Sequence, residues 1–202
     1  MKKKIVITIS RQYGSGGREI GQALSERLNI PFYDKDLIML AAKESRFDEN
    51  LFKNEDQEKK NPFSYLLSIY SNAMSHYDLS LNDQVFLIQT KVIREVAKNS
   101  CVIIGRVADY ILRNEENLFR IYIHAPLDDR IKRSIDEYHD DPDEVSDKIN
   151  RIDKNRATYY NYYANAKWGN ISNYDLTLNS SLLGIEGCID VIEQAVKLID
   201  NQ

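Results

Sequence analysis

Cysteine and long apolar runs are both scarce in this sequence. The 202 residues contain two cysteines, Cys101 and Cys188, which lie far apart and belong to no Cys-x-x-Cys pair. This spacing argues against a zinc site or a redox motif and predicts two buried thiols that pack like small apolar side chains. No stretch approaches the roughly 20 apolar residues that span a bilayer, and the run from Ile5 to Ile9 is too short for a signal peptide. We therefore expect a cytoplasmic protein with no membrane partner.

A basic excess is also missing. The sequence carries 27 lysine and arginine residues against 31 aspartate and glutamate residues, a formal net charge of -4. Proteins that coat nucleic acids usually have a clear basic excess, so we expect no nucleic-acid partner, although a local basic pocket is compatible with this balance. The content of 43% hydrophobic and 29% charged residues is ordinary for a globular protein, and the length predicts a single domain over 1–202. Homo-oligomerisation stays open.

Short β-branched runs alternate with helical patterns along the chain. Lys4–Ser10 is almost continuously apolar, which is typical of a strand buried on both faces of a parallel sheet. Further strands are predicted at Pro31–Asp34, Ser100–Gly105, Phe119–Ala125 and Tyr174–Asn179. Helices are predicted over Arg18–Asn29, Asp36–Lys43, Asp83–Lys98, Asp128–Tyr138, Val145–Tyr163 and Ile185–Ile199. This alternation predicts an α/β fold with a parallel sheet of about five strands flanked by helices.

The segment 45–80 has a weaker pattern. It contains a charged run, Asn54–Asn61, followed by an amphipathic piece near Pro62–Tyr70. Two interpretations have equal weight: a variable helical insertion on the acceptor side of a site, or a solvated surface insertion.

A glycine cluster follows the first predicted strand directly. Residues 10–19 read SRQYGSGGRE and lead into a predicted helix. Glycines let the backbone turn tightly and bring successive N–H groups to one anion, and the helix N-terminus adds the positive end of its dipole. Such a loop lies at the carboxyl end of a strand, where ligands bind in open α/β sheets. The predicted phosphate-binding residues are Tyr13, Gly14, Ser15, Gly16, Gly17, Arg18 and Glu19; a plain glycine-rich turn is the alternative.

Two chemical groups of the usual phosphate loop are missing. The usual pattern ends in Gly-Lys-Ser/Thr, and here the lysine position falls on Gly17 with no serine or threonine after it. The loop therefore lacks the ammonium that reaches the β- and γ-phosphates and the hydroxyl that binds Mg²⁺. Arg18 is the candidate substitute for the cation. The metal ligands are unknown, and Glu19 is a candidate that would act through water.

The opening segment SRQYGSGGREIGQAL, followed by IPFYDKDLI, resembles the start of the cytidylate-kinase-like family. The similarity touches nearly the whole chain outside 45–80. It implies a three-layer P-loop NTPase fold with a helical lid over about 134–156. It also implies a nucleotide kinase that uses ATP and Mg²⁺, with small-molecule nucleotides as its partners.

The same resemblance assigns residues to the acceptor. Asp34 matches an aspartate in the second-strand segment of cytidylate kinases, and Arg106 matches the arginine of a Gly-Arg pair that holds the monophosphate. Two positions depart from the family pattern: Val107 replaces the aspartate that follows this pair, and Ile104 replaces the acidic residue before it. Asp109 is the candidate that would compensate for Val107.

Four arginines match the family's lid region. Arg130 and Arg133 lie on one predicted helix, and Arg151 and Arg156 lie on the next. The resemblance implies that they reach the transferred phosphate, a task for which the planar, always charged guanidinium is well suited. Arg130 and Arg133 share a helix face, whereas the spacing of Arg151 and Arg156 allows this only loosely. The alternative for each is a solvated charge paired with a nearby aspartate.

Three functions are compatible with these features. The first is a kinase that moves the γ-phosphate of ATP to a small phosphorylated acceptor, a nucleoside monophosphate such as CMP or dCMP. The missing lysine and hydroxyl motivate the second, a nucleotide-binding sensor or regulatory protein without catalysis. The third is a kinase for a non-nucleotide acceptor, because Val107 and the segment 45–80 leave the acceptor side open.

Overall fold

Five parallel strands form one sheet in the described part of the protein. The computed structural model describes residues 3–34, 36 and 81–201, so the segment 45–80 and all but the first residue of the helix predicted over Asp36–Lys43 lie outside it. The strands are β1 (Val6–Arg11), β2 (Phe32–Tyr33), β3 (Cys101–Ile104), β4 (Leu118–His124) and β5 (Leu176–Asn179). Their order is β2-β3-β1-β4-β5, and each neighbouring pair is parallel. The predicted parallel α/β sheet is confirmed.

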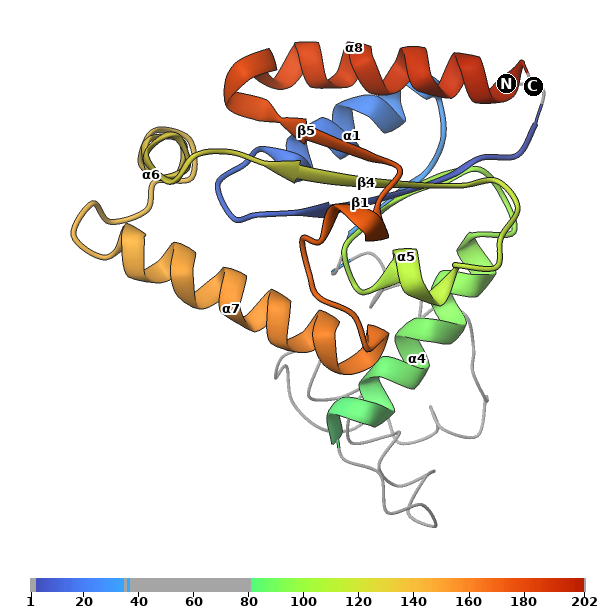
Figure 1. Ribbon diagram of the computed structural model, residues 1–202, viewed down its shortest axis with the longest axis horizontal. Helices are drawn as coiled ribbons and strands as arrows, with labels where there is room; N and C mark the ends of the chain where they lie inside the picture. Colours follow the sequence, from blue (N-terminus) through green and yellow to red (C-terminus); the bar gives the residue numbers. More distant parts are fainter. Residues whose placement is uncertain (1–2, 35, 37–80, 202) are drawn as a thin grey trace, which may run out of the picture.

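Helices cover both faces of this sheet, which gives the predicted three layers. They are α1 (Gly17–Leu28), α4 (Leu81–Val96), α5 (Ala108–Ile111), α6 (Leu127–Asp136), α7 (Val145–Ala164), the 3₁₀ turn η2 (Ile171–Asn173) and α8 (Ser180–Asp200). Helices α1 and α8 lie together on one face, whereas α4 and α5 lie on the other (Figure 1). No helix within the described ranges is long and apolar enough to cross a membrane.

The alternating side chains of β1 build two separate cores. Ile7 and Ile9 are fully buried against α1 and α8, where they pack with Leu24 and Ile189. Val6 points to the opposite face and joins the core under α4 and α5. Successive strand residues face opposite ways, so a continuous apolar run is stable only when both faces are covered. Each such side chain contributes about 1.5–3 kcal/mol by its burial.

The two cysteines are divided between these cores. Cys101 lies in the core under α4 and Cys188 in the core under α8. Both are buried and unbonded, as the sequence predicted. Burial raises the pKa of the Cys101 thiol to about 12, so this group stays an inert thiol at neutral pH.

Helices α5 and α8 differ from the sequence prediction. Helix α5 was not predicted, because four residues are too few to show a helical period. Helix α8 begins at Ser180 rather than Ile185, with the Asn179 side chain accepting a hydrogen bond from the Ser181 N–H at 3.0 Å. Its first turn is separated by a kink at Gly184, whose φ of 70° is not helical. The apolar pattern therefore shows only the second part of α8.

Candidate functional site

The loop after β1 has the shape expected of a phosphate loop. Strand β1 ends at Arg11 and α1 begins at Gly17. Between them, Gly14 and Gly16 have φ values of 75° and 72°, a left-handed conformation that costs residues with a Cβ roughly 1–2 kcal/mol. Among the residues that the structure describes, no side chain caps the N-terminus of α1, so its first N–H groups are available to an anion.

A cavity of about 370 Å³ opens in front of this loop. It is lined by Arg11, Gln12, Tyr13, Gly14, Gly16, Gly17, Arg18, Glu19, Tyr138 and Arg156. Six of the seven predicted loop residues are therefore brought together here. The seventh, Ser15, is fully buried, and its hydroxyl donates to the Gln12 carbonyl at 2.8 Å. Ser15 thus holds the loop from beneath rather than facing the cavity.

A buried ion pair between Arg130 of α6 and Asp153 of α7 forms hydrogen bonds to the loop. The Arg130 guanidinium, in a residue only 8% exposed, donates to the Asp153 carboxylate at 2.7 Å and to the Tyr13 carbonyl at 3.2 Å. The other Asp153 oxygen accepts from the Tyr13 N–H at 2.8 Å. Asp153 therefore binds a loop amide that is available in many phosphate loops to a ligand oxygen.

Two further predicted arginines contact the loop, and one does not. Arg133 donates to the Gly14 carbonyl and Arg156 to the Arg11 carbonyl, each at 3.0 Å. Arg151, in contrast, is exposed on α7 and lines neither of the cavities beside the loop. The five-residue spacing decides this, because it turns Arg151 and Arg156 by well over a quarter of a turn relative to one another.

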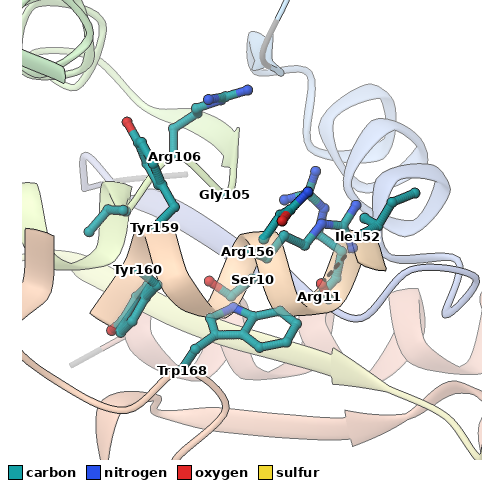
Figure 2. A pocket seen from close by; sticks show the side chains of 11 residues that line it. Ser10, Arg11, Gly105, Arg106, Ile152, Arg156, Tyr159, Tyr160 and Trp168 are labelled. Atoms are coloured by element: carbon teal, nitrogen blue, oxygen red, sulfur yellow. Dashed lines mark hydrogen bonds between the residues drawn. The ribbon is translucent and has the colours of Figure 1, made fainter. Parts of the chain in front are cut away.

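A second cavity, of about 480 Å³, adjoins the first. It is lined by Ser10, Arg11, Gly105, Arg106, Val107, Ile152, Asn155, Arg156, Tyr159, Tyr160 and Trp168. Figure 2 shows the guanidinium groups of Arg11 and Arg156 near one another on the side of Ile152, with Arg106 beside Tyr159. Arg11 and Arg156 line both cavities and so stand at their boundary.

A left-handed turn after β3 places Arg106 in this second cavity. Gly105, Arg106 and Val107 have φ values of 67°, 56° and 58° in succession. Two of them carry a Cβ and one is β-branched, so this backbone is strained by about 1–3 kcal/mol per such residue. The Val107 side chain is 3% exposed and packs against Tyr160, which helps to hold the turn. Strain of this kind gathers at binding sites.

Arg18 and Asp34, predicted for opposite substrates, pair with each other. Arg18 Nε and Nη2 donate to Asp34 Oδ2 at 3.0 and 2.8 Å. The Arg18 side chain is 59% exposed, whereas that of Asp34 is 10% exposed. The pair joins the start of α1 to the end of β2 beside the loop.

Glu19 and Tyr138 both line the first cavity. Tyr138 belongs to the connection between α6 and α7, and its hydroxyl lies near the Glu19 carboxylate. Burial and a hydrogen bond to Glu19 raise the pKa of the Tyr138 hydroxyl. Within residues 3–34, 36 and 81–201, no group of three or more His, Cys, Asp or Glu side chains could hold a metal ion. If a phosphate ligand bound together with a metal ion, Glu19 is the loop carboxylate that lines the first cavity and could reach that ion.

Asp109 lies beneath the second cavity rather than in its lining. It is 4% exposed and accepts a hydrogen bond from the Tyr160 hydroxyl at 2.7 Å. Burial raises the pKa of the Asp109 carboxyl, and the bond to Tyr160 lowers it by a smaller amount. This carboxyl supports Tyr160, which does line the cavity.

The substitution Asp109→Asn is expected to make the stability of the protein less dependent on pH. Because the folded-state pKa of Asp109 is raised, folding is penalised above that pKa and unpenalised below the ordinary carboxyl pKa. The asparagine oxygen can still accept from Tyr160, but its NH₂ group replaces Asp109 Oδ1, which has no hydrogen-bond partner among the described residues, and this adds a cost at every pH. Relative to the original protein, the free energy of unfolding of the variant should therefore be higher at pH 8 than at pH 5 by on the order of 1 kcal/mol, as measured by urea unfolding. Glu116→Gln, at an exposed carboxylate, is the control; an equal pH dependence of the two variants would contradict the expectation.

Sequence reasoning missed Arg11, although it lines both cavities. The available signal was its position, since it follows the buried strand directly and stands where the usual phosphate loop has its first glycine. Tyr138 was also missed, because a lone tyrosine in a connection between helices carries no pattern.

Comparison with known proteins agrees with this architecture. The sequence profile of the cytidylate kinase-like family matches residues 6–182. A cytidylate kinase from Sulfolobus acidocaldarius is 25% identical over 187 residues, which cover 92% of this chain and 91% of that protein. A cytidylate kinase from Methanosarcina barkeri is 25% identical over 191 residues, which cover 94% and 95%.

Two solved structures are also similar. An uncharacterized protein from Eubacterium ventriosum is 27% identical and superposes with a TM-score of 0.73. The alignment covers 98% of this chain and 100% of that chain. A shikimate kinase from Bacteroides thetaiotaomicron, 15% identical with a TM-score of 0.55 over 96% and 99% of the two chains, shares the fold. Because the family profile spans most of the sequence, from β1 into α8, the chain belongs to the cytidylate kinase-like family.

Proposed function

We propose that this protein is a kinase that transfers the γ-phosphate of ATP to a nucleoside monophosphate such as CMP or dCMP. The observation that carries this proposal is the meeting of two cavities at Arg11 and Arg156, one in front of the phosphate loop and one in front of the strained β3 turn. The family, and relatives that are named cytidylate kinase, support this class of donor and acceptor. In this proposal the chain works as one domain, with 134–156 as its lid.

The donor phosphates would lie on the loop. The free N–H groups at the start of α1 and the helix dipole attract them. A third cavity, of about 300 Å³, is lined by Arg133 and Ser180, and each of these also donates to a loop carbonyl. This adjacency supports the third cavity as the site that would hold the donor nucleoside. Mg²⁺ would neutralise phosphate charge, held by the phosphates and water with Glu19 reached through water.

The acceptor would lie in the second cavity. Arg106 is placed there by the strained turn, where its planar fork can hold a monophosphate. Aromatic side chains of Tyr159, Tyr160 and Trp168 form another part of the wall and offer flat surfaces to a base. Asp34, paired with Arg18, stands at the edge of β2 on the same side as the loop.

The chemistry needs positioning and positive charge rather than a base. An oxygen of the acceptor phosphate bonds to the γ-phosphorus, the bond from that phosphorus to the bridging oxygen breaks, and ADP leaves. The acceptor phosphate is already anionic, so no proton has to be removed before attack. Charge on the transferring group is then stabilised by Arg156 at the boundary between the cavities.

A direct assay tests this function. The purified protein is incubated with ATP, Mg²⁺ and each nucleoside monophosphate in turn, and ADP release and the phosphorylated product are measured. We expect ADP release that depends on the acceptor, with CMP or dCMP the best substrate. ATP binding without ADP release from any acceptor would contradict the proposal and favour a nucleotide sensor. Release only with non-nucleotide acceptors would keep the kinase and reject this acceptor class.

A further inference from the structure

The side chain of Arg11 is packed into the phosphate loop from the end of β1. A Cβ added to Gly17 would lie 2.5 Å from Arg11 Cβ and 2.9 Å from its Cγ. A Cβ added to Gly105 would overlap the guanidinium itself. The two glycines therefore make the space in which this arginine lies, between the start of α1 and the end of β3.

Positions 11 and 17 exchange their usual residue types. The phosphate-loop pattern G-x-x-x-x-G-K has glycine at its first position and lysine at its seventh. With Gly16 on the second glycine, the first position falls on Arg11 and the seventh on Gly17. The cation is thus lost from one end of the loop and gained at the other. A side chain at position 17 would collide with the stem of Arg11, so the two changes fit one another.

The positive charges near Arg11 favour the binding of an anion. Burial, followed by the charges of Arg156 and Arg106, lowers the pKa of Arg11 to about 9, and Asp34 and Asp153 offset only part of this effect. Throughout the described ranges, the Arg11 guanidinium has no hydrogen-bond or ion-pair partner. A phosphate placed among these guanidinium groups would relieve their mutual repulsion.

We propose that Arg11 is the phosphate-binding cation of this loop and takes the place of the missing lysine. The inference rests on the proposed function for its biological role, but it concerns phosphate binding itself. Arg18, the substitute expected from the sequence, holds Asp34 with two hydrogen bonds instead. Arg11 lines both cavities, whereas Arg18 lines only the first.

Binding of inorganic tripolyphosphate, measured by calorimetry, tests the proposal without any acceptor. Arg11→Met keeps the apolar stem and removes the charge, and we expect affinity to fall roughly tenfold to a hundredfold. Arg18→Met is expected to change affinity by less than about threefold, because the Arg18 guanidinium forms an ion pair with Asp34. Arg113→Met, at an exposed arginine beyond α5, is the matched control. Unchanged affinity in Arg11→Met would overturn the proposal, and a loss in Arg18→Met alone would return the role to Arg18.

A reciprocal exchange separates charge from structure. Arg11→Gly is expected to lose tripolyphosphate binding, and Gly17→Lys alone to lose it through collision with the Arg11 stem. The double variant Arg11→Gly/Gly17→Lys restores the usual pattern and should bind tripolyphosphate at least tenfold more tightly than Arg11→Gly. A double variant that folds, as judged by its thermal unfolding, and binds no better than Arg11→Gly would contradict the exchange.

These readouts fail independently of the kinase assay. If no acceptor is phosphorylated but tripolyphosphate binding depends on Arg11, the proposed function is wrong and the phosphate-binding role stands. If acceptors are phosphorylated and Arg11→Met binds tripolyphosphate like the unmodified protein, the role of Arg11 is wrong and the proposed function stands.

Discussion

Replacing Arg156 with methionine is expected to lower kcat by roughly 10²- to 10³-fold. Arg156 lines both cavities and donates a hydrogen bond to the Arg11 carbonyl at 3.0 Å. In the proposed reaction, the transferred group would pass beside this guanidinium. The Arg156 side chain is 24% exposed, and burial lowers the pKa of its guanidinium, so water screens this charge less than it would at the surface. A charge in such surroundings acts strongly on a developing phosphoryl charge. Steady-state kinetics with the best acceptor measures the loss.

Two companion variants give this result its meaning. Lys154→Met removes an exposed cation from the same helix and should leave kcat within about twofold of the original. Arg156→Lys keeps the charge without the planar fork and should fall between the methionine variant and the original protein. A kcat for Arg156→Met within about threefold of the original, with unchanged thermal unfolding, would remove Arg156 from the transfer step.

Replacing Gly14 with alanine is expected to cost about 2–4 kcal/mol of stability and to abolish phosphate binding. The φ of 75° at this residue is unfavourable for alanine. The added Cβ would also lie 2.6 Å from the Arg130 carbonyl oxygen and 2.8 Å from Ser134 Oγ. Since the first of these atoms is backbone, relief requires α6 and the loop to move apart.

Urea unfolding of a matched pair of variants checks this expectation. Gly187→Ala lies within the regular part of α8, where the new Cβ would meet only Leu183 Cβ at 3.4 Å. Alanine has the higher helix propensity, so this variant should gain about 0.5–1 kcal/mol. Two variants of the same kind should therefore move in opposite directions. A stable Gly14→Ala protein that still binds tripolyphosphate would contradict the loop geometry.

The sheet and the loop were predictable because their signals are local. A buried parallel strand needs a run of apolar residues, and Lys4–Ser10 and Ser100–Gly105 both have one. The loop between β1 and α1 needs glycines at fixed spacing for its left-handed turns, and Gly14 and Gly16 supply them. Such patterns hold wherever the rest of the chain lies. Short or bent elements, such as α5 and the first turn of α8, lack a full period and escaped prediction.

The partners of the charged residues were not predictable in this way. The charge of Arg18 and its neighbours in the sequence do not indicate whether its partner is a phosphate or a carboxylate. Its pairing with Asp34 depends on how α1 and β2 meet across the first crossover. Asp109, likewise, is five residues beyond the end of β3, and only the packing of α7 against α5 buries it under Tyr160.

The sequence by itself determined the alternation of strands and helices and the glycine loop, because each depends on residues close together in the chain, and it determined the family through a match over residues 6–182. Only the tertiary structure decided which arginines gather at the site. Arg156 reaches it and Arg151 does not, since α7 presents one face to the loop. Arg11 lies between Gly17 and Gly105, residues from two distant segments. Where a charge lies is set by the packing of elements from distant parts of the chain, and no local pattern records that packing.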